Sequence, residues 1–140
     1  MMNHPVIQRG SKTVIAMAHV PALPGAPDYD SQMGMQKLHD WVARDVEALQ
    51  TGGVDAIMFG NEFDRPYVLK APPEGLAALT AVVTEVQKIL KVPFGVNYLW
   101  DPVATVALAS ATGASFAREI YSGVYALSLI HISEPTRPVP

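Results

Sequence analysis

Seven polar or charged residues occur where apolar segments of the chain end, and their types suit acid/base chemistry and ligand binding. They are His19, Asn61, Glu62, Asp64, Asn97, Arg118 and Glu119. Imidazole and carboxylate groups can transfer protons, amides can bind hydroxyl groups, and a guanidinium can bind a carboxylate or a phosphate. If the four apolar segments are parallel strands, these side chains share one edge of a sheet, where α/β proteins build their active sites.

His19 and Glu62 are the two candidates for a catalytic acid or base. His19 ends the apolar segment TVIAMAHV and precedes a loop rich in proline and glycine. Its ring therefore either serves the site or hydrogen-bonds that loop. Glu62 follows the apolar run AIMF and lies three residues before Arg65. Its carboxylate either transfers protons or forms a salt bridge within the loop.

Four residues are predicted to bind the substrate: Asn61, Asn97, Arg118 and Glu119. Asn97 lies in an otherwise apolar segment, VPFGVNYL, and a buried amide needs hydrogen-bond partners that a ligand or a neighbouring polar residue would supply. Arg118 either binds an anionic ligand in forked geometry or forms an ion pair with Glu119 or Glu62. The sequence leaves both alternatives open.

The sequence predicts no metal site and indicates no particular cofactor. His19 together with Glu62 or Asp64 would offer nitrogen and oxygen ligands, but these residues form no local metal-binding motif, and Asp64 is expected to be structural. The glycines match neither a dinucleotide-binding fingerprint nor a phosphate-binding P-loop.

The four apolar segments predict four buried strands, of which the second is the clearest. Residues 56–59 are continuously apolar, as is typical of a strand covered on both faces in a parallel sheet, and Gly60 and the polar cluster follow directly. The other strands are predicted at residues 13–20, 92–99 and 115–121.

Three helices are predicted between these strands. Residues 33–50 place apolar side chains, Trp41 among them, at helical spacing. A second helix begins near Pro73 and continues until Pro93 closes it.

The third predicted helix is short and rich in alanine. It follows Asp101, the expected N-cap, has Pro102 in its first turn and ends at Gly113. The resulting order, β-α-β-α-β-α-β, predicts a parallel sheet with right-handed crossovers.

The composition sets limits on class and partners. A chain of 140 residues with 49% hydrophobic residues can form one domain with a real core. A net charge of −3 without a basic stripe makes nucleic acid an unexpected partner. No apolar run approaches the roughly 20 residues that span a bilayer, and cysteine is absent, so we expect a cytoplasmic protein that is not membrane-embedded.

The last residues differ from the rest of the chain. Residues 127–137, LSLIHISEPTR, resemble the translation of a sequencing-library adapter. The segment has no periodicity that would continue a βα unit, and three of the last six residues are prolines. We therefore predict a non-native tail at residues 127–140 and exclude His131 and Glu134 as site candidates.

Four motifs resemble those of the BtpA/SgcQ family, in particular its SgcQ-like branch. They are MAHVPALPGAP, GGVDAIMFGNEFDRPY, GVNYLWDP and ATGASFAREIYSGVY, and the resemblance spans roughly residues 10–125. It implies a (β/α)₈ TIM barrel of the ribulose-phosphate-binding type, about 250 residues long. Residues 1–126 would supply its N-terminal half, with about four strands and three helices.

The resemblance implies two alternative functions and leaves open whether the protein is an enzyme. The first is a barrel that binds or converts a small phosphorylated or sugar-derived metabolite. This barrel would be inactive as the present fragment, and the full-length protein could be a homo-oligomer. Some family members carry a phosphoribosylanthranilate-isomerase-like label, which transfers fold better than function. The second is a non-catalytic assembly or stability factor for a membrane complex, as in photosystem I biogenesis. The motif VNYLWDP lacks the Arg and the Asn-Asp pair of the photosystem branch.

Overall fold

Four parallel strands, in the order of the sequence, form a single sheet in the computed structural model, which describes residues 6–8 and 10–120. The strands are β1 (Ile15–His19), β2 (Ala56–Gly60), β3 (Phe94–Asn97) and β4 (Phe116–Ala117). The helices between them are α1 (Gly34–Thr51), α2 (Pro73–Val86), followed by the 3₁₀ turn η1 (Gln87–Ile89), and α3 (Pro102–Thr112). The predicted tail at residues 127–140 lies outside the described residues.

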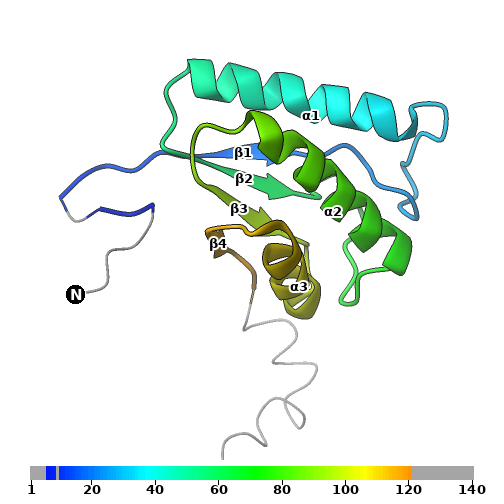
Figure 1. Cartoon of the computed structure of the whole chain (residues 1–140). Coiled ribbons are helices and arrows are strands. Elements are labelled where there is room, and N and C mark those ends of the chain that lie inside the picture. The colour runs from blue at the N-terminus through cyan, green and yellow to red at the C-terminus, as the bar shows by residue number, and fades with distance from the viewer. Residues whose placement is uncertain (1–5, 9, 121–140) are drawn as a thin grey trace, which may run out of the picture.

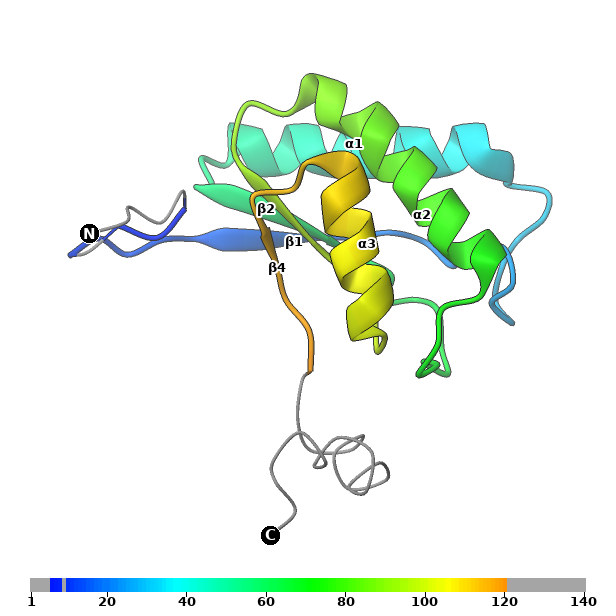
Figure 2. The same ribbon diagram turned by 60° about the horizontal axis from the view of Figure 1, so that its bottom comes forward.

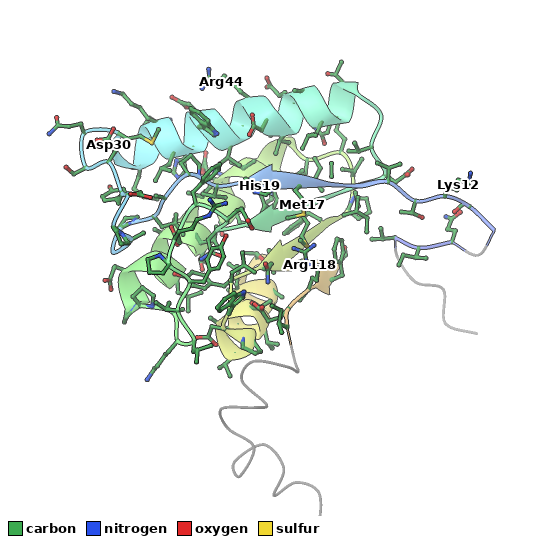
Figure 3. The ribbon with its side chains drawn as sticks, turned by 180° about the vertical axis from the view of Figure 1, so that it is seen from behind. Lys12, Met17, His19, Asp30, Arg44 and Arg118 are labelled. Atoms are coloured by element: carbon green, nitrogen blue, oxygen red, sulfur yellow. The ribbon has the colours of Figure 1, made fainter. Side chains whose placement is uncertain are left out.

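The three helices lie on the same side of the sheet (Figures 1 and 2). Side chains that alternate along the strands pack under these helices and form the core: Ala18, Val20, Ile57, Phe59, Val96 and Tyr98. The intervening residues face the opposite side, which we call the inner face: Ile15, Met17, His19, Met58, Gly60, Gly95, Asn97, Phe116 and Arg118. Figure 3 shows Met17, His19 and Arg118 on this side of the sheet.

The first helix confirms the predicted segment but not the position of Trp41. Leu38, Val42 and Val46, at four-residue spacing, are fully buried against the sheet and α2. Trp41 was expected to share their face, yet it is 42% exposed, and the Arg44 guanidinium lies 5.6 Å from the centre of its ring. The expectation was wrong because the buried face of α1 is narrower than the set of its apolar residues at helical spacing.

The other two helices begin where the sequence predicted. α2 begins at Pro73, but its regular α-helical part ends at Val86, earlier than expected, because η1 tightens the last turn. At the start of α3 the Asp101 carboxylate accepts a hydrogen bond of 3.0 Å from the Ala104 N–H. The helix ends at Gly113, whose φ of 73° a glycine adopts without strain.

The last two strands are shorter than predicted. β3 ends at Asn97 because the Tyr98 N–H donates to the Thr105 hydroxyl, at 2.9 Å, instead of continuing the ladder. β4 comprises two residues, and Tyr121, its predicted end, lies outside the described residues. The Phe116 ring lies directly over Gly95, where an added Cβ would be 2.3 Å from Phe116 Cε2.

None of the described helices combines the length and the apolar character that a membrane span requires.

The open inner face and the two sheet edges lead to a first prediction: the chain on its own associates or stays partly folded. Light scattering after size-exclusion chromatography should show species larger than a monomer. Ile15→Lys puts a charge on a 38%-exposed inner-face position and should shift the chain towards smaller species. Val103→Lys, at a 79%-exposed position of α3, should leave the distribution unchanged. A monodisperse monomer that melts cooperatively would contradict the prediction.

Candidate functional site at the carboxyl edge of the sheet

Three of the predicted site residues share one row of the inner face. His19 pairs with Gly60, Gly60 pairs with Asn97, and Arg118 follows Ala117, which pairs with Val96. We call His19, Gly60, Asn97 and Arg118 the inner row. Since neighbouring strands lie about 4.8 Å apart, the row measures roughly 14 Å from His19 to Arg118, which suits a small metabolite.

His19 is half-buried, and its ring contacts Phe63, the residue after Glu62. The two ring centroids are 6.1 Å apart in an edge-to-face arrangement. The Glu62 carboxylate instead lies 3.7 Å from the Arg65 guanidinium, which is the loop salt bridge that the sequence allowed. The Arg65 side chain is exposed, so this pair adds little stability and leaves the carboxylate accessible.

The Arg118 guanidinium has no ion-pair or hydrogen-bond partner within the described part of the chain. The ion pair with Glu119 or Glu62 that the sequence allowed is not formed there. Arg118 borders a hollow of about 420 Å³ on the inner face, otherwise lined by apolar groups such as Met17, Met58 and Phe116. Side chains normally fill the interior of a complete barrel, so the rim beside Arg118 is a better ligand site than this hollow.

Asn97 is almost completely buried, and the two residues that follow β4 hold its amide. Its Nδ2 donates to the Arg118 carbonyl oxygen, at 2.5 Å, and to Glu119 Oε2, at 2.8 Å. Glu119 Oε2 also accepts a hydrogen bond of 2.9 Å from the Thr105 hydroxyl of α3. Glu119 therefore anchors Asn97 to α3.

Sequence reasoning missed Thr105. It is fully buried, and besides Glu119 it binds the backbone at the end of β3. The available signal was a hydroxyl residue on the buried side of an Ala-rich helix, since a buried hydroxyl group needs a partner, although Thr112 of the same helix is buried as well.

Asn61 and Asp64 join the three loops that follow β1, β2 and β3. Asp64 Oδ1 accepts from the Leu23 N–H, at 2.7 Å, and Asp64 Oδ2 accepts from Asn61 Nδ2, at 3.1 Å. Asn61 Oδ1 accepts from the Leu99 N–H, at 2.7 Å. We call Asn61 and Asp64 with these contacts the loop clamp. Both residues are buried, so Asn61, a predicted substrate-binding residue, is occupied by protein partners.

Burial raises the pKa of Asp64, although its hydrogen bonds to Leu23 and Asn61 act in the opposite direction. Burial also raises the pKa of Tyr98, and the carboxylates of Asp64, Glu74 and Asp101 add to this effect. The Tyr98 phenol therefore stays protonated at neutral pH and packs in the core. A cavity of about 50 Å³ between the phenol and the loop clamp is large enough only for water.

Within the described residues, no three His, Asp or Glu side chains come together in a way that could hold a metal ion.

The model of the BtpA family matches residues 10–134. The chain belongs to the BtpA family. The match reaches beyond residue 126, the predicted boundary of the native part, into residues that the structure does not describe.

Relatives of this BtpA-family chain include two proteins with informative names. The putative sgc region protein SgcQ of Escherichia coli is 53% identical over 115 residues, which are 82% of this chain and 43% of SgcQ. The photosystem I biogenesis protein BtpA of Synechocystis is 31% identical over 116 residues, which are 81% of this chain and 40% of that protein. The chain thus spans less than half the length of these relatives.

Among solved structures, dihydropteroate synthase from Xanthomonas albilineans is similar, with a TM-score of 0.56 and 17% identity over 85% of this chain and 40% of that one. That enzyme is a TIM barrel, so the likeness supports the predicted fold: the BtpA-family chain forms about four strands and three helices of a parallel α/β barrel. At this identity the likeness concerns the fold alone.

A second prediction concerns the loop clamp. Asp64→Ala should lower the free energy of unfolding by roughly 2–4 kcal/mol, because the Leu23 N–H and Asn61 Nδ2 each lose a buried partner. The measurement is urea unfolding of the 140-residue chain and of a second protein, which we call the completed chain. In the completed chain, residues 1–120 are fused to the part of SgcQ that follows the segment matched by this chain. Asp45→Ala, at an exposed position of α1, is the control and should change stability little. Equal effects of the two substitutions would contradict the clamp.

A third prediction follows from the raised pKa of Asp64. The folded chain binds this proton more tightly than the unfolded chain does, so Asp64 stabilises the fold most below pH 3.8, the ordinary carboxyl pKa, and less as the pH rises through the raised pKa. The stability of the unmodified protein relative to Asp64→Asn should therefore fall as the pH increases through this window. Urea unfolding of the completed chain with and without the substitution, over a pH series, measures the difference, and a constant or rising difference would refute the prediction.

Proposed function

We propose that the BtpA-family barrel to which this chain contributes binds a small phosphorylated or sugar-derived anion at the inner row. The observation that carries the proposal is the Arg118 guanidinium, which lies at the rim without a partner in the described part of the chain. A guanidinium has five donors in a planar fork that matches carboxylate and phosphate groups. Its charge is always present, so an anion gains a charge-assisted contact there.

Conversion of such a ligand would use His19, the titratable side chain of the inner row that lies across the site from Arg118. A ligand whose anionic group binds Arg118 would extend along the row towards the imidazole, the group best suited to transfer protons near neutral pH. An isomerisation, an aldol-type step or a hydrolysis would each use such a group. Glu62 is the second acid/base candidate, because its long contact with Arg65 leaves the carboxylate accessible.

The remaining predicted binding residues act through others in this proposal. Asn61 holds the loops in place as part of the loop clamp, and Glu119 orients Asn97. Cytoplasmic localisation and a homo-oligomeric full-length protein stay predictions from the sequence.

The alternative function, a non-catalytic assembly factor, has two supports. One is the relationship to the photosystem I biogenesis protein of Synechocystis. The other is an apolar hollow of about 320 Å³ beside α1, where Trp41 and Phe63 are 42% and 46% exposed. Exposed aromatic side chains around a hollow are typical of protein-binding surfaces.

A fourth prediction tests the anion site. In isothermal titration and thermal-shift measurements, sugar phosphates should bind and stabilise the protein, in the 140-residue chain or in the completed chain. Arg118→Ala should weaken binding roughly 10- to 100-fold, the equivalent of one charge-assisted contact. Arg44→Ala removes a comparable charge from the exposed side of α1 and should leave binding unchanged.

The outcomes separate the two functions. Equal losses for the two arginine variants would indicate a general charge effect and refute the anion site. No binding by either form of the protein, together with co-purification of a membrane complex that Trp41→Ala abolishes, would favour the assembly function.

A further inference from the structure

The inner row contains one buried hydrogen-bond acceptor that nothing in the described chain satisfies. Asn97 is 1% exposed, and its Oδ1 is buried without a hydrogen-bond partner within the described residues. Native proteins rarely leave such an atom unpaired, because it loses its hydration and gains nothing in return.

The acceptor cannot be removed by rotating the amide. Asn97 Nδ2 already donates to the Arg118 carbonyl oxygen and to Glu119 Oε2. A flipped amide would bring Oδ1 against these two acceptors. Glu119 is itself held, since its Oε2 accepts from Thr105 and its Oε1 accepts from the Ile120 N–H, at 2.9 Å. The direction of Oδ1 is therefore fixed, and a hydrogen bond from Nδ2 to a carboxylate polarises the amide and strengthens Oδ1 as an acceptor.

Oδ1 is adjacent to the place in the row that has no side chain. A Cβ added to Gly60 would lie 3.9 Å from Asn97 Oδ1 and 3.7 Å from Met17 Cε. These are ordinary contacts, and the φ of Gly60 is not positive, so neither packing nor backbone conformation requires a glycine there. The flexible end of the Met17 side chain reaches the same place and can move aside at little cost.

We propose that Asn97 Oδ1 accepts a hydrogen bond from a hydroxyl group of the ligand, in the space above Gly60, and so selects a hydroxylated anion over its deoxy counterpart. This inference rests on the proposed function, because Arg118 holds the anionic group of the same ligand. An amide oxygen accepts and cannot donate, so a carbonyl, an ether or a methylene group gains nothing at this position. A site built around a hydroxyl group rejects an analogue that lacks it, because the buried acceptor is then left unpaired.

The test compares ligands that differ only in their hydroxyl groups. Glycerol 3-phosphate is compared with n-propyl phosphate, and glycerate with propionate, so that phosphate and carboxylate anions are distinguished. Inorganic phosphate reports on the anion contact alone. Titration calorimetry on the 140-residue chain or on the completed chain should show at least tenfold tighter binding of the hydroxylated member of one pair, about 1.4 kcal/mol.

Gly60→Ala is the decisive variant, since it fills the space without altering Asn97. It should reduce the preference for the hydroxylated ligand to below about threefold and leave the binding of inorganic phosphate unchanged. Gly52→Ala, in the loop between α1 and β2, is the matched control and should keep the full preference. Asn97→Leu should also remove the preference, but Gly60→Ala keeps the test valid if that variant does not fold.

Each outcome is informative. Equal affinity of the unmodified protein for both members of each pair, with inorganic phosphate still bound, would overturn the selectivity of Asn97 and leave the anion site intact. A preference that survives Gly60→Ala would overturn the assigned position of the hydroxyl group. If neither form of the protein binds any of these anions, the anion site fails, and the inference fails with it.

Discussion

The buried carboxylate of Asp64 is the constraint on which the carboxyl edge of the sheet depends. Three loops that are distant in sequence meet there, and their backbone N–H groups need acceptors that no strand supplies. Asp64 supplies one to the loop after β1, and through Asn61 it is connected to the loop after β3. Burying a carboxylate costs free energy, as its raised pKa shows. The cost is offset because one small side chain fixes the ends of three strands relative to one another.

This arrangement separates the polar groups at the edge into two kinds. Asn61, Asp64 and Glu119 use their side chains for contacts inside the protein. The Arg118 guanidinium and Asn97 Oδ1 remain without partners in the described chain. The first kind makes the framework rigid, and the second kind is held in place by it. Candidate ligand contacts are therefore identified by which hydrogen-bonding groups remain unused, a property that residue type alone does not reveal.

Features that depend on residues close together in the sequence were predictable from the sequence. The βα order, the Asp101 cap and the Gly113 end of α3 follow from local rules, and the family motifs indicated the barrel. The exposure of Trp41, the short β4 and the role of Thr105 depend on packing between distant segments. For the same reason the sequence could indicate which polar residues reach the edge but could not show which of them are already paired.

The contact between Phe116 and Gly95 helps to align the short strand that leads to Arg118. The backbone bonds from Ser115 to Phe94 and from Arg118 to Val96 hold this two-residue strand as well, and a shift by one position would turn every side chain of β4 to the opposite side. The bare backbone of Gly95 accepts the Phe116 ring, whereas any side chain at residue 95 would expel it. The missing side chain of Gly95 thus contributes to the packing of the strand that precedes the positive charge. Substitution of Gly95 would therefore displace the Phe116 ring from the strand that leads to Arg118.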